Sequence, residues 1–384
     1  MKVAVLGYGT VGAGVYSMLS DAPGMEAGPV LVRPGKAVES FMVSDAALIF
    51  GDPTVDAVVE TLGGLDPAYS YGMRALEAGK HFITANKAMV AAHGLELAAL
   101  AREKGAAFLF SAACGGGVPF LHNLALSAET DRIEAVSGIL NGTTNYMLDA
   151  MQRRNLSYGD ALREAQSLGY AESDPTADVS GLDALRKMQL ACAVAFGVLP
   201  QSGMLCEGME HFTAADVEDI QSRGLVCRLM ARGSRAGESV SAYVEPVLFP
   251  RAAPESSVFT NNNMARYTGK RCGSIVLMGQ GAGRFPTASA VLRDLAAAQQ
   301  GARSMFPENC RAAEADNREA VHSYYIRTGG FAAVRLSLRS VLAQGEVVRA
   351  VTEPMSAEKM HALAQNIRKD GNDLFFAALE EELC

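Results

Sequence analysis

The sequence predicts an α/β protein whose first part is a parallel sheet covered by helices on both faces. Short apolar runs alternate with amphipathic stretches over residues 1–110, and a glycine-rich turn follows the first apolar run. After Pro119 this alternation stops. Strands that alternate with helices form parallel sheets, because each helix returns the chain to the same end of the sheet. The change after Pro119 therefore marks a second domain of another class.

Five short apolar runs in the first part are expected to be strands, and three stretches with apolar residues at helical spacing are expected to be helices. The predicted strands are residues 3–6, 30–32, 57–60, 81–84 and 106–110, and the predicted helices are residues 11–19, 67–78 and 88–104. We expect right-handed crossovers between these strands.

The second part groups its strands and helices, which is typical of an α+β domain. Its predicted strands are residues 133–140, 240–249 and 274–278, and its predicted helices are residues 158–168 and 182–196. A further helix is expected after the turn at residues 141–145, with a threonine as its cap. The sheet of this domain is expected to leave an open edge or face that dimerisation covers.

The C-terminal residues predict a short αβ module. Its expected elements are a strand at 323–327, a helix at 332–342, a strand at 347–352 and a helix at 356–369. A helix at residues 288–300 is expected to pack back on the first domain. We therefore predict three domains: residues 1–125 together with 280–305, residues 126–279, and residues 318–384.

Composition excludes several classes of protein. A net charge of −8 leaves no basic stripe for a nucleic acid or an anionic membrane. The chain opens on a predicted strand rather than a signal peptide, and no apolar run approaches the roughly 18 residues of a spanning helix. Seven scattered cysteines never form Cys-x-x-Cys, and the six histidines form no metal-binding pair. We expect a cytoplasmic protein without disulfides or a structural transition metal.

Residues 7–12 have the pattern Gly-x-Gly-x-x-Gly between a predicted strand and a predicted helix. The first glycine of such a turn permits a tight bend, the second lets a pyrophosphate approach the backbone, and the third lets the helix pack closely on the strand. The phosphates meet free N–H groups at the helix N-terminus. An isolated motif can be a plain glycine-rich turn, but this context predicts a Rossmann-type dinucleotide-binding domain. The expected contacts are Gly7, Tyr8, Gly9, Thr10, Val11 and Gly12.

The end of the second strand, about 20 residues beyond the glycine turn, is where such domains distinguish NAD from NADP. The sequence there contains Arg33 and Lys36 and has no acidic residue to bind an adenosine ribose. A 2′-phosphate would find a guanidinium and an ammonium instead. The two cations can also be ordinary solvated loop charges. We favour NADP and keep NAD as the alternative.

Residues 169–187 crowd four carboxylates and two cations around a loop and a helix start. Asp183 and Lys187 are four residues apart on the predicted helix and therefore share a face. Taken alone, this pair can be a surface ion pair, which contributes roughly a few tenths of a kcal/mol to stability. The helix beyond Lys187 is almost wholly apolar, which places the charges at the mouth of a buried element. An amino-acid aldehyde needs such a set: carboxylates for its ammonium and a proton donor for its oxygen.

Several segments together resemble the homoserine dehydrogenase family. They are residues 169–187, 141–145, 84–87 and 279–288, and they stand in the family's order, so that the resemblance covers about residues 1–300. The resemblance implies reversible NAD(P)-dependent reduction of L-aspartate 4-semialdehyde to L-homoserine, a step of threonine and methionine biosynthesis. It also implies a homodimer.

The same resemblance assigns roles to residues of this chain. Lys187 is the expected proton donor to the aldehyde oxygen, and Lys87 is expected near the nicotinamide, assisting proton movement. The expected substrate contacts are Glu172, Asp183, Asp178 and Thr143. The further expected cofactor contacts are Thr61, Gly63, Lys87, Gly169 and Gly283.

The chain departs from the family at the cation loop and between the second strand and Lys87, where it is shorter than is usual. The family's monovalent cation, such as sodium, would be held through Ser111, Cys114, Gly116 and Val118, but Ser111 cannot supply an anionic oxygen, which leaves only backbone carbonyls as weak ligands. Cys114 is expected to be a small buried residue rather than a nucleophile. Residues 320–384 look like an abbreviated ACT-type regulatory domain without a ligand loop, so we do not expect threonine feedback.

Two other functions remain open at this point. Another amino-acid Rossmann oxidoreductase, such as an aspartate dehydrogenase, would oxidise NAD(P)H with oxaloacetate and ammonia. A catalytically weak dinucleotide-binding sensor would keep the glycine turn but would not need Glu172, Asp183 and Lys187 together. The joint presence of these three residues counts against the sensor.

Overall fold

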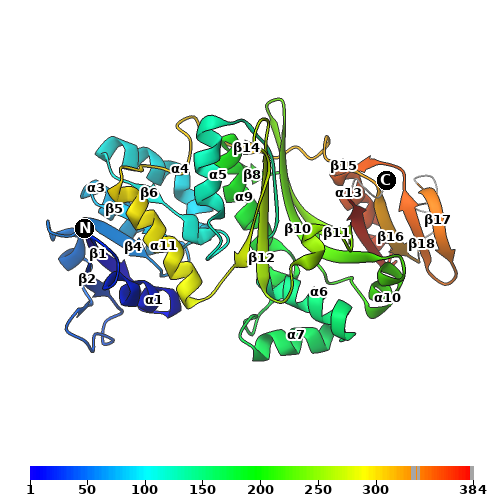
Figure 1. Ribbon diagram of the computed structural model, residues 1–384, viewed down its shortest axis with the longest axis horizontal. Coiled ribbons are helices and arrows are strands. Elements are labelled where there is room, and N and C mark those ends of the chain that lie inside the picture. Colours follow the sequence, from blue (N-terminus) through cyan, green and yellow to red (C-terminus); the bar gives the residue numbers. More distant parts are fainter. Residues whose placement is uncertain (330–333, 335–337, 381–384) are drawn as a thin grey trace. The chain divides into compact units, whose positions relative to one another are not determined.

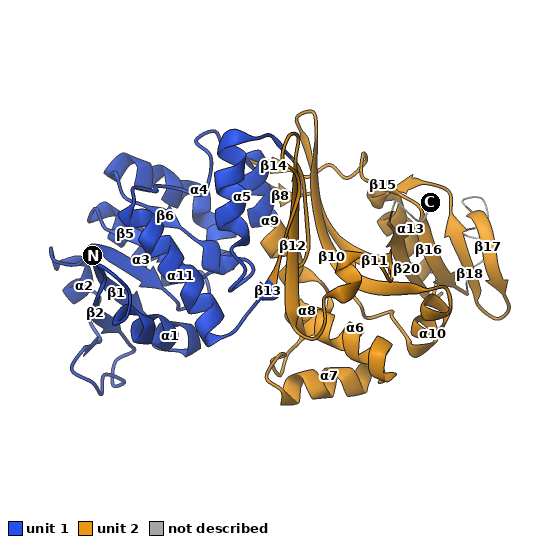
Figure 2. Ribbon diagram, in the orientation of Figure 1, with its two compact units in different colours: residues 1–133, 189–199, 279–311 blue, residues 134–188, 200–278, 312–384 orange. Residues whose placement is uncertain are grey.

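The computed structural model describes residues 1–329, 334 and 338–380. The chain divides into two compact units, coloured separately in Figure 2. Unit 1 comprises residues 1–133, 189–199 and 279–311, and unit 2 comprises residues 134–188, 200–278 and 312–384. Across the described residues, no helix has the length and apolar character needed to cross a membrane.

Unit 1 is built on a six-stranded parallel sheet in the order β3-β2-β1-β4-β5-β6. The strands are β1 (Lys2–Leu6), β2 (Glu26–Leu31), β3 (Met42–Val43), β4 (Ala57–Glu60), β5 (His81–Thr84) and β6 (Phe108–Leu109). Every residue of β4 is buried. Successive side chains of a strand point to opposite faces, so this sheet is covered on both sides. The strand order is that of doubly wound dinucleotide-binding domains, which reverses between β1 and β4.

The helices of unit 1 flank this sheet. Their bounds are α1 (Thr10–Leu19), α2 (Ala47–Phe50), α3 (Ala68–Glu77), α4 (Lys87–Lys104), α5 (Phe120–Thr130) and α11 (Arg284–Gln299), with the 3₁₀ turn η1 (Ser111–Ala113). Helix α11 packs beside α1, although the two are far apart in the sequence (Figure 1). Helix α4 begins at the Asn86 cap, whose side chain accepts from the Met89 N–H, and ends at Gly105 in the left-handed region.

Unit 2 contains a ten-stranded mixed sheet in the order β13-β12-β7-β10-β11-β20-β16-β18-β17, with β9 added beside β11. The strands are β7 (Ile133–Ile139), β9 (Leu205–Cys206), β10 (Leu225–Ala236), β11 (Ser239–Pro250), β12 (Asn262–Gly269), β13 (Gly273–Gln280), β16 (Tyr324–Thr328), β17 (Leu338–Gln344), β18 (Val348–Thr352) and β20 (Leu374–Leu379). Strands β10 and β11 form a long antiparallel hairpin whose twelve pairs run from Leu225↔Pro250 to Ala236↔Ser239.

The remaining elements belong to unit 2 or are shared by the two units, since residues 189–199 of α9 and β8 and residue 311 of β14 are part of unit 1. The helices are α6 (Gly142–Arg154), α7 (Tyr158–Ser167), α8 (Thr176–Val179), α9 (Leu182–Phe196), α10 (Ala214–Ser222) and α13 (Ala357–Lys369), with the 3₁₀ turn η2 (Pro254–Ser257). The short strands are β8 (Val198–Ser202), β14 (Arg311–Glu314), β15 (Val321–His322) and β19 (Met355–Ser356). One apolar core joins the central sheet to α13, from Val247 and Phe249 to Met360 and Ile367.

The predicted fold class is confirmed, with corrections to individual elements. Residues 338–342, expected in a helix, lie in β17, where the backbone groups pair with β18; the rest of that predicted helix, apart from residue 334, lies outside the described residues. The short C-terminal αβ module is part of the confirmed fold class, and its described residues contribute four strands to the sheet of unit 2. The three-domain division itself stays a prediction.

Candidate functional site

The glycine turn of unit 1 has the geometry that its three glycines require. Gly7 has φ +98°, a backbone conformation that side chains with a Cβ rarely adopt, and its N–H donates to the Leu31 carbonyl at 3.0 Å. A Cβ on Gly12 would lie 2.1 Å from the Gly7 carbonyl oxygen, so α1 can approach β1 only with glycine there. At Gly9 nothing lies within 4 Å of the corresponding position, so its backbone faces open space. Thr10 and Val11 begin α1.

A pocket of about 1070 Å³ opens beside this turn. Its wall includes Gly7, Tyr8, Gly9, Thr61, Arg33 and Lys36. The wall also includes Glu39, which sequence reasoning missed. Glu39 lies in the loop between β2 and β3, eight residues after β2 ends, so spacing from that strand gave no signal for it. The exposed backbone at Gly9 and the size of this pocket fit a dinucleotide.

The ends of β4 and β5 are held together next to the pocket. The buried Glu60 carboxylate accepts from the Thr84 hydroxyl at 2.5 Å and from the Gly63 N–H at 3.2 Å. Asn86 donates from Nδ2 to the Gly64 carbonyl at 2.6 Å. Lys87 is the half-buried first residue of α4, directly after this cap. In a doubly wound sheet, the carboxyl ends of the strands are where ligands bind.

The predicted cation loop after β6 is held by α11. Ser111 donates from its N–H and its hydroxyl to the Asp294 carboxylate at 2.7 and 2.6 Å. Burial raises the pKa of Asp294 to about 7. Arg293 donates to the Gly117 carbonyl at 3.1 Å. The nearest carboxylate to Ser111 is therefore engaged in hydrogen bonds to Ser111 itself.

The cation site stays a prediction. Among the described residues, no cluster of three or more His, Cys, Asp or Glu side chains is arranged to hold a metal ion. Cys114 is buried, and Val118 is buried four residues further on. A Cβ on Gly116 would lie 2.5 Å from the Gly281 carbonyl oxygen, so the loop passes close to the residues that precede α11. Gly283 is the N-cap of that helix.

In unit 2, the structure brings together Lys187 and Asp183. The Lys187 ammonium donates to Asp183 Oδ2 at 2.7 Å and to the Leu140 carbonyl at 2.6 Å. Both side chains are 12% exposed. A charge pair at this depth differs from a solvated surface pair, because its desolvation must be offset by close hydrogen bonds. The i,i+4 spacing in α9 brings the Asp183 and Lys187 side chains together, and Leu140, directly after β7, provides the carbonyl oxygen.

Asn141 links this pair to a second carboxylate. Its Nδ2 donates to Asp183 Oδ2 at 2.9 Å and to Asp178 Oδ1 at 2.7 Å. Its Oδ1 accepts from the Thr144 N–H at 2.8 Å, so Asn141, rather than the expected threonine, caps α6. The sequence pattern flagged this turn but not the asparagine that joins the carboxylates. Asn141 stands directly before a predicted helix, at the N-cap position where asparagine is favoured, and this position could have identified it.

Asp178 and Thr143 complete the group. The Thr143 hydroxyl donates to the Tyr170 carbonyl at 2.6 Å and lies 3.2 Å from Asp178 Oδ2. Burial is the largest cause that raises the pKa of Asp178, and the nearby Asp183 raises it further, while the Asn141 hydrogen bond lowers it. We call Asn141, Thr143, Asp178, Asp183 and Lys187 the carboxylate network.

Two other predicted residues stand apart from this network. The Glu172 side chain is exposed, and in the described structure only its backbone carbonyl accepts a hydrogen bond, from Gln166 Nε2 at 3.1 Å. Gly169 follows α7 with φ +74°. The structure therefore groups three of the four predicted substrate residues with Lys187, but not Glu172.

Comparisons with known proteins identify the chain's relatives. The family model for homoserine dehydrogenase matches residues 119–296, and the model for the homoserine dehydrogenase NAD binding domain matches residues 7–111. A homoserine dehydrogenase of Synechocystis sp. is 37% identical over 319 residues, which cover 77% of this chain and 72% of that protein. One from Corynebacterium glutamicum is 38% identical over 317 residues, covering 77% and 71%.

Solved structures give the same result over the whole chain. A homoserine dehydrogenase from Thiobacillus denitrificans has a TM-score of 0.87 and 30% identity, and the match covers 99% of this chain and 98% of that one. A homoserine dehydrogenase from S. aureus has a TM-score of 0.77 and 26% identity, covering 99% of both chains.

Proposed function

The chain belongs to the homoserine dehydrogenase family, oxidoreductases that act on a CH–OH group, and we propose that the carboxylate network binds and protonates the substrate. The predicted family and enzyme class are confirmed, and none of the comparisons supports an aspartate dehydrogenase or a sensor. A nicotinamide dinucleotide is the cofactor of such a domain. The reaction interconverts L-aspartate 4-semialdehyde and L-homoserine.

The hydrogen bonds of Lys187 carry this proposal. Two oxygens, from Asp183 and Leu140, hold its ammonium in one direction. A bound nicotinamide supplies the hydride to the carbonyl carbon. As negative charge develops on the carbonyl oxygen, Lys187 Nζ stabilises that charge and transfers a proton to it. In the reverse direction, the neutral amine accepts the hydroxyl proton of homoserine.

The acidic residues bind the other end of the substrate. Asp183 and Asp178 accept hydrogen bonds from the substrate ammonium, and Asn141, which donates to both carboxylates, holds them side by side for this role. Glu172, on its exposed loop, is proposed as a further acceptor, and Thr143 orients Asp178. Lys87 assists proton movement from the start of α4. Fixed orientation of the substrate supplies much of the rate.

Lys187→Ala tests the proposal. We expect kcat to fall by about 10²–10⁴-fold, because general acid–base catalysis contributes that much. The cofactor Kd should be unchanged, since the glycine turn is not altered. Arg186→Ala is the matched control: it removes the neighbouring cation of α9, whose side chain is exposed. The measurements are homoserine-dependent reduction of the nicotinamide and a fluorescence titration with the reduced cofactor.

Two results would contradict this role of Lys187. One is near-normal turnover of Lys187→Ala. The other is an equal loss of kcat in Arg186→Ala, which would show that general positive charge on α9, rather than the held ammonium, supports the reaction.

NADP is the proposed cofactor, with NAD as the alternative. Arg33 and Lys36 line the pocket beside the glycine turn, and their two positive charges exceed the single negative charge of Glu39. A 2′-phosphate that loses one charged hydrogen bond binds about tenfold more weakly. We expect Arg33→Ala to lower kcat/KM for NADP by that factor and to leave kcat/KM for NAD unchanged. A wild type that uses NAD better than NADP would exclude this preference.

The finer assignments of partner and location are also proposals. A homodimer is supported by the apolar edge strand β13, which exposes Ile275, Val276 and Met278. A cytoplasmic location is supported by the cysteines, because no disulfide joins the six that the structure describes.

A further inference from the structure

The turn between α8 and α9 determines where the two acidic residues of the network lie. Asp178 is in α8 and Asp183 is in the first turn of α9, so residues 179–181 set the spacing between their carboxylates. Gly181, with φ +82°, allows the sharp change of direction. Any shift of this turn would move Asp178 and Asp183 relative to each other.

A second loop, residues 206–209, holds this turn. Met209 donates from its N–H to the Val179 carbonyl at 2.9 Å, and the Cys206 thiol donates to the Ser180 carbonyl at 3.0 Å. The contact leaves no free space, because a Cβ on Gly208 would lie 2.2 Å from the Val179 carbonyl oxygen. The position of residues 179–181 therefore follows the position of residues 206–209.

The C-terminal helix α13 in turn holds the 206–209 loop. Arg368, in the last turn of α13, donates to both carboxylate oxygens of Glu207, at 2.6 and 3.0 Å. The side chains are 22% and 10% exposed, respectively, and Arg368 also donates to the Leu374 carbonyl at 2.8 Å. Ion pairs with two parallel hydrogen bonds fix the relative orientation of the two side chains as well as the distance between them. On its other side, Glu207 donates from its N–H to the Val244 carbonyl at 2.8 Å.

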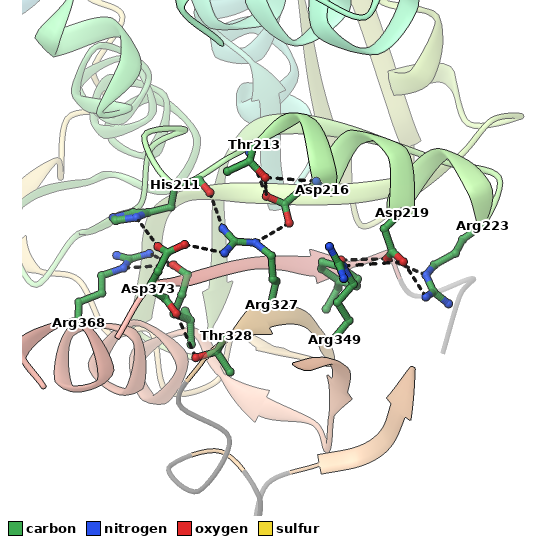
Figure 3. Close-up of polar contacts among 12 residues, drawn as sticks. His211, Thr213, Asp216, Asp219, Arg223, Arg327, Thr328, Arg349, Arg368 and Asp373 are labelled. Carbon is green, nitrogen blue, oxygen red and sulfur yellow. Dashed lines mark hydrogen bonds and ion pairs between the residues drawn. The ribbon is translucent and has the colours of Figure 1, made fainter. Parts of the chain in front are cut away.

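A second contact from the C-terminal strands reaches the same segment. Arg327 of β16 donates to the His211 carbonyl at 2.9 Å, to Asp216 Oδ1 at 2.7 Å and to Asp373 Oδ2 at 2.6 Å (Figure 3). Asp373 in addition lies 3.0 Å from His211 Nδ1. The segment that follows the 206–209 loop is thus also attached to the C-terminal residues.

We propose that Glu207 and Arg368 are positioning residues for substrate binding. Their ion pair fixes the 206–209 loop, this loop fixes the turn at residues 179–181, and the turn sets the spacing of Asp178 and Asp183. Residues near the C-terminus thereby control the affinity for the substrate ammonium without touching the substrate. The inference rests on the proposed role of Asp178 and Asp183.

Arg368→Ala, Arg368→Lys and Glu207→Gln test this inference in the full chain. We expect Arg368→Ala to raise KM for homoserine about tenfold, because displaced binding groups lose much of their effect. KM for NADP should stay within about twofold, since the glycine turn has no part in this chain of contacts. Arg368→Lys should be intermediate, because an ammonium cannot form the two parallel hydrogen bonds of a guanidinium. The double variant should be no worse than the poorer single variant, as coupled residues are not additive.

Arg223→Ala is the matched control, because Arg223 also forms a two-bonded ion pair within unit 2, with Asp219 of α10, and this pair does not contact the 206–209 loop. Thermal unfolding of every variant separates positioning from stability. If Arg368→Ala unfolds at the assay temperature, Glu207→Gln and Arg368→Lys, which keep side-chain size, carry the test.

A lowered Tm with an unchanged KM for homoserine would overturn the inference, as would an equal rise of both KM values. If the wild type is active and the variants keep its KM for homoserine, this inference is overturned and the proposed function is not. A wild type without homoserine-dependent turnover would overturn the proposed function as well.

Discussion

Single residues in the carboxylate network act through the polar atoms that surround them. Asp183 is buried at a depth where an unpaired carboxylate would lose roughly several kcal/mol of hydration free energy. Hydrogen bonds from Lys187 and Asn141 compensate for this loss. Only part of this arrangement is visible in the sequence: the i,i+4 spacing predicts the contact of Asp183 with Lys187. The hydrogen bonds that join Leu140 to Lys187 and Asn141 to Asp183 link residues more than 40 positions apart, so no local sequence pattern predicts them.

The glycine turn allows a prediction that separates folding from cofactor binding. Gly9→Ala should fold with near-normal stability, because nothing lies within 4 Å of the added Cβ, yet it should bind the cofactor at least about tenfold more weakly, because the methyl group occupies the approach of the pyrophosphate. Gly12→Ala should lower both Tm and cofactor affinity, since its Cβ would meet the Gly7 carbonyl oxygen at 2.1 Å. Thermal unfolding and cofactor titration measure the two effects.

Equal cofactor affinity in Gly9→Ala and the wild type would mean that the pyrophosphate does not contact this backbone. The cofactor would then have to bind elsewhere in the pocket.

At the scale of secondary structure, the elements that the sequence predicts are those whose burial is uniform or periodic. The strands β1, β4 and β5 were predicted to within one residue, because strands buried on both faces are continuous apolar runs. Strand β10 was missed. It contains Arg228, only 1% exposed, whose guanidinium donates to the carbonyls of Glu255 and Ser256, and Arg232, which pairs with Glu380. These partners lie far along the chain, so the local sequence does not show that charged residues at these positions are buried in a strand.

Helix α11 allows a prediction about pH. Burial raises the pKa of Asp294 to about 7, above its ordinary value of 3.8, so the folded protein binds a proton that the unfolded chain releases between these values. This contribution to stability is complete below the unfolded pKa and is lost as the pH rises through the folded pKa. Over this pH range the free energy of unfolding falls by at most about 1.4 kcal/mol per pH unit.

Asp294→Asn removes this titration. We therefore expect the free energy of unfolding of the variant, relative to that of the wild type, to be higher at pH 8 than at pH 5, in urea unfolding measured at both values. Ser111→Ala provides a control that keeps the carboxyl group while removing its hydroxyl donor. Parallel pH profiles for the wild type and Asp294→Asn would show that Asp294 is ionised in the folded protein over this range.

For the whole molecule, the two units draw on segments that are distant in the sequence. Unit 1 includes residues 279–311 in addition to the N-terminal sheet, and unit 2 includes the C-terminal strands as part of its sheet. A helix at residues 288–300 was expected to pack on the first domain, and α11 packs beside α1 in unit 1. The joining of β20 and β16 to β11 could not be, because nothing in the local pattern of a strand identifies its neighbour.

The ten-stranded sheet ends in two edge strands, and these lead to a prediction about assembly. In β13 the neighbouring residues Ile275 and Val276 are 36% and 43% exposed, and they point to opposite faces of the sheet. An exposed apolar edge strand is a surface that associates with another chain. If a second copy covers this strand, Val276→Lys either buries an ammonium group in the interface or forces the two copies apart. Val276→Lys should then raise the dimer dissociation constant at least about a hundredfold.

Val341→Lys is the matched control, because Val341 is 47% exposed on β17, the opposite edge of the same sheet. It should leave the mass unchanged. Sedimentation velocity over a range of concentrations, with Tm as the measure of folding, distinguishes the variants. A monomeric wild type would rule out the dimer itself. Dissociation by Val341→Lys but not by Val276→Lys would instead assign the association to the edge formed by β17, and the exposed residues of β13 would then need another explanation.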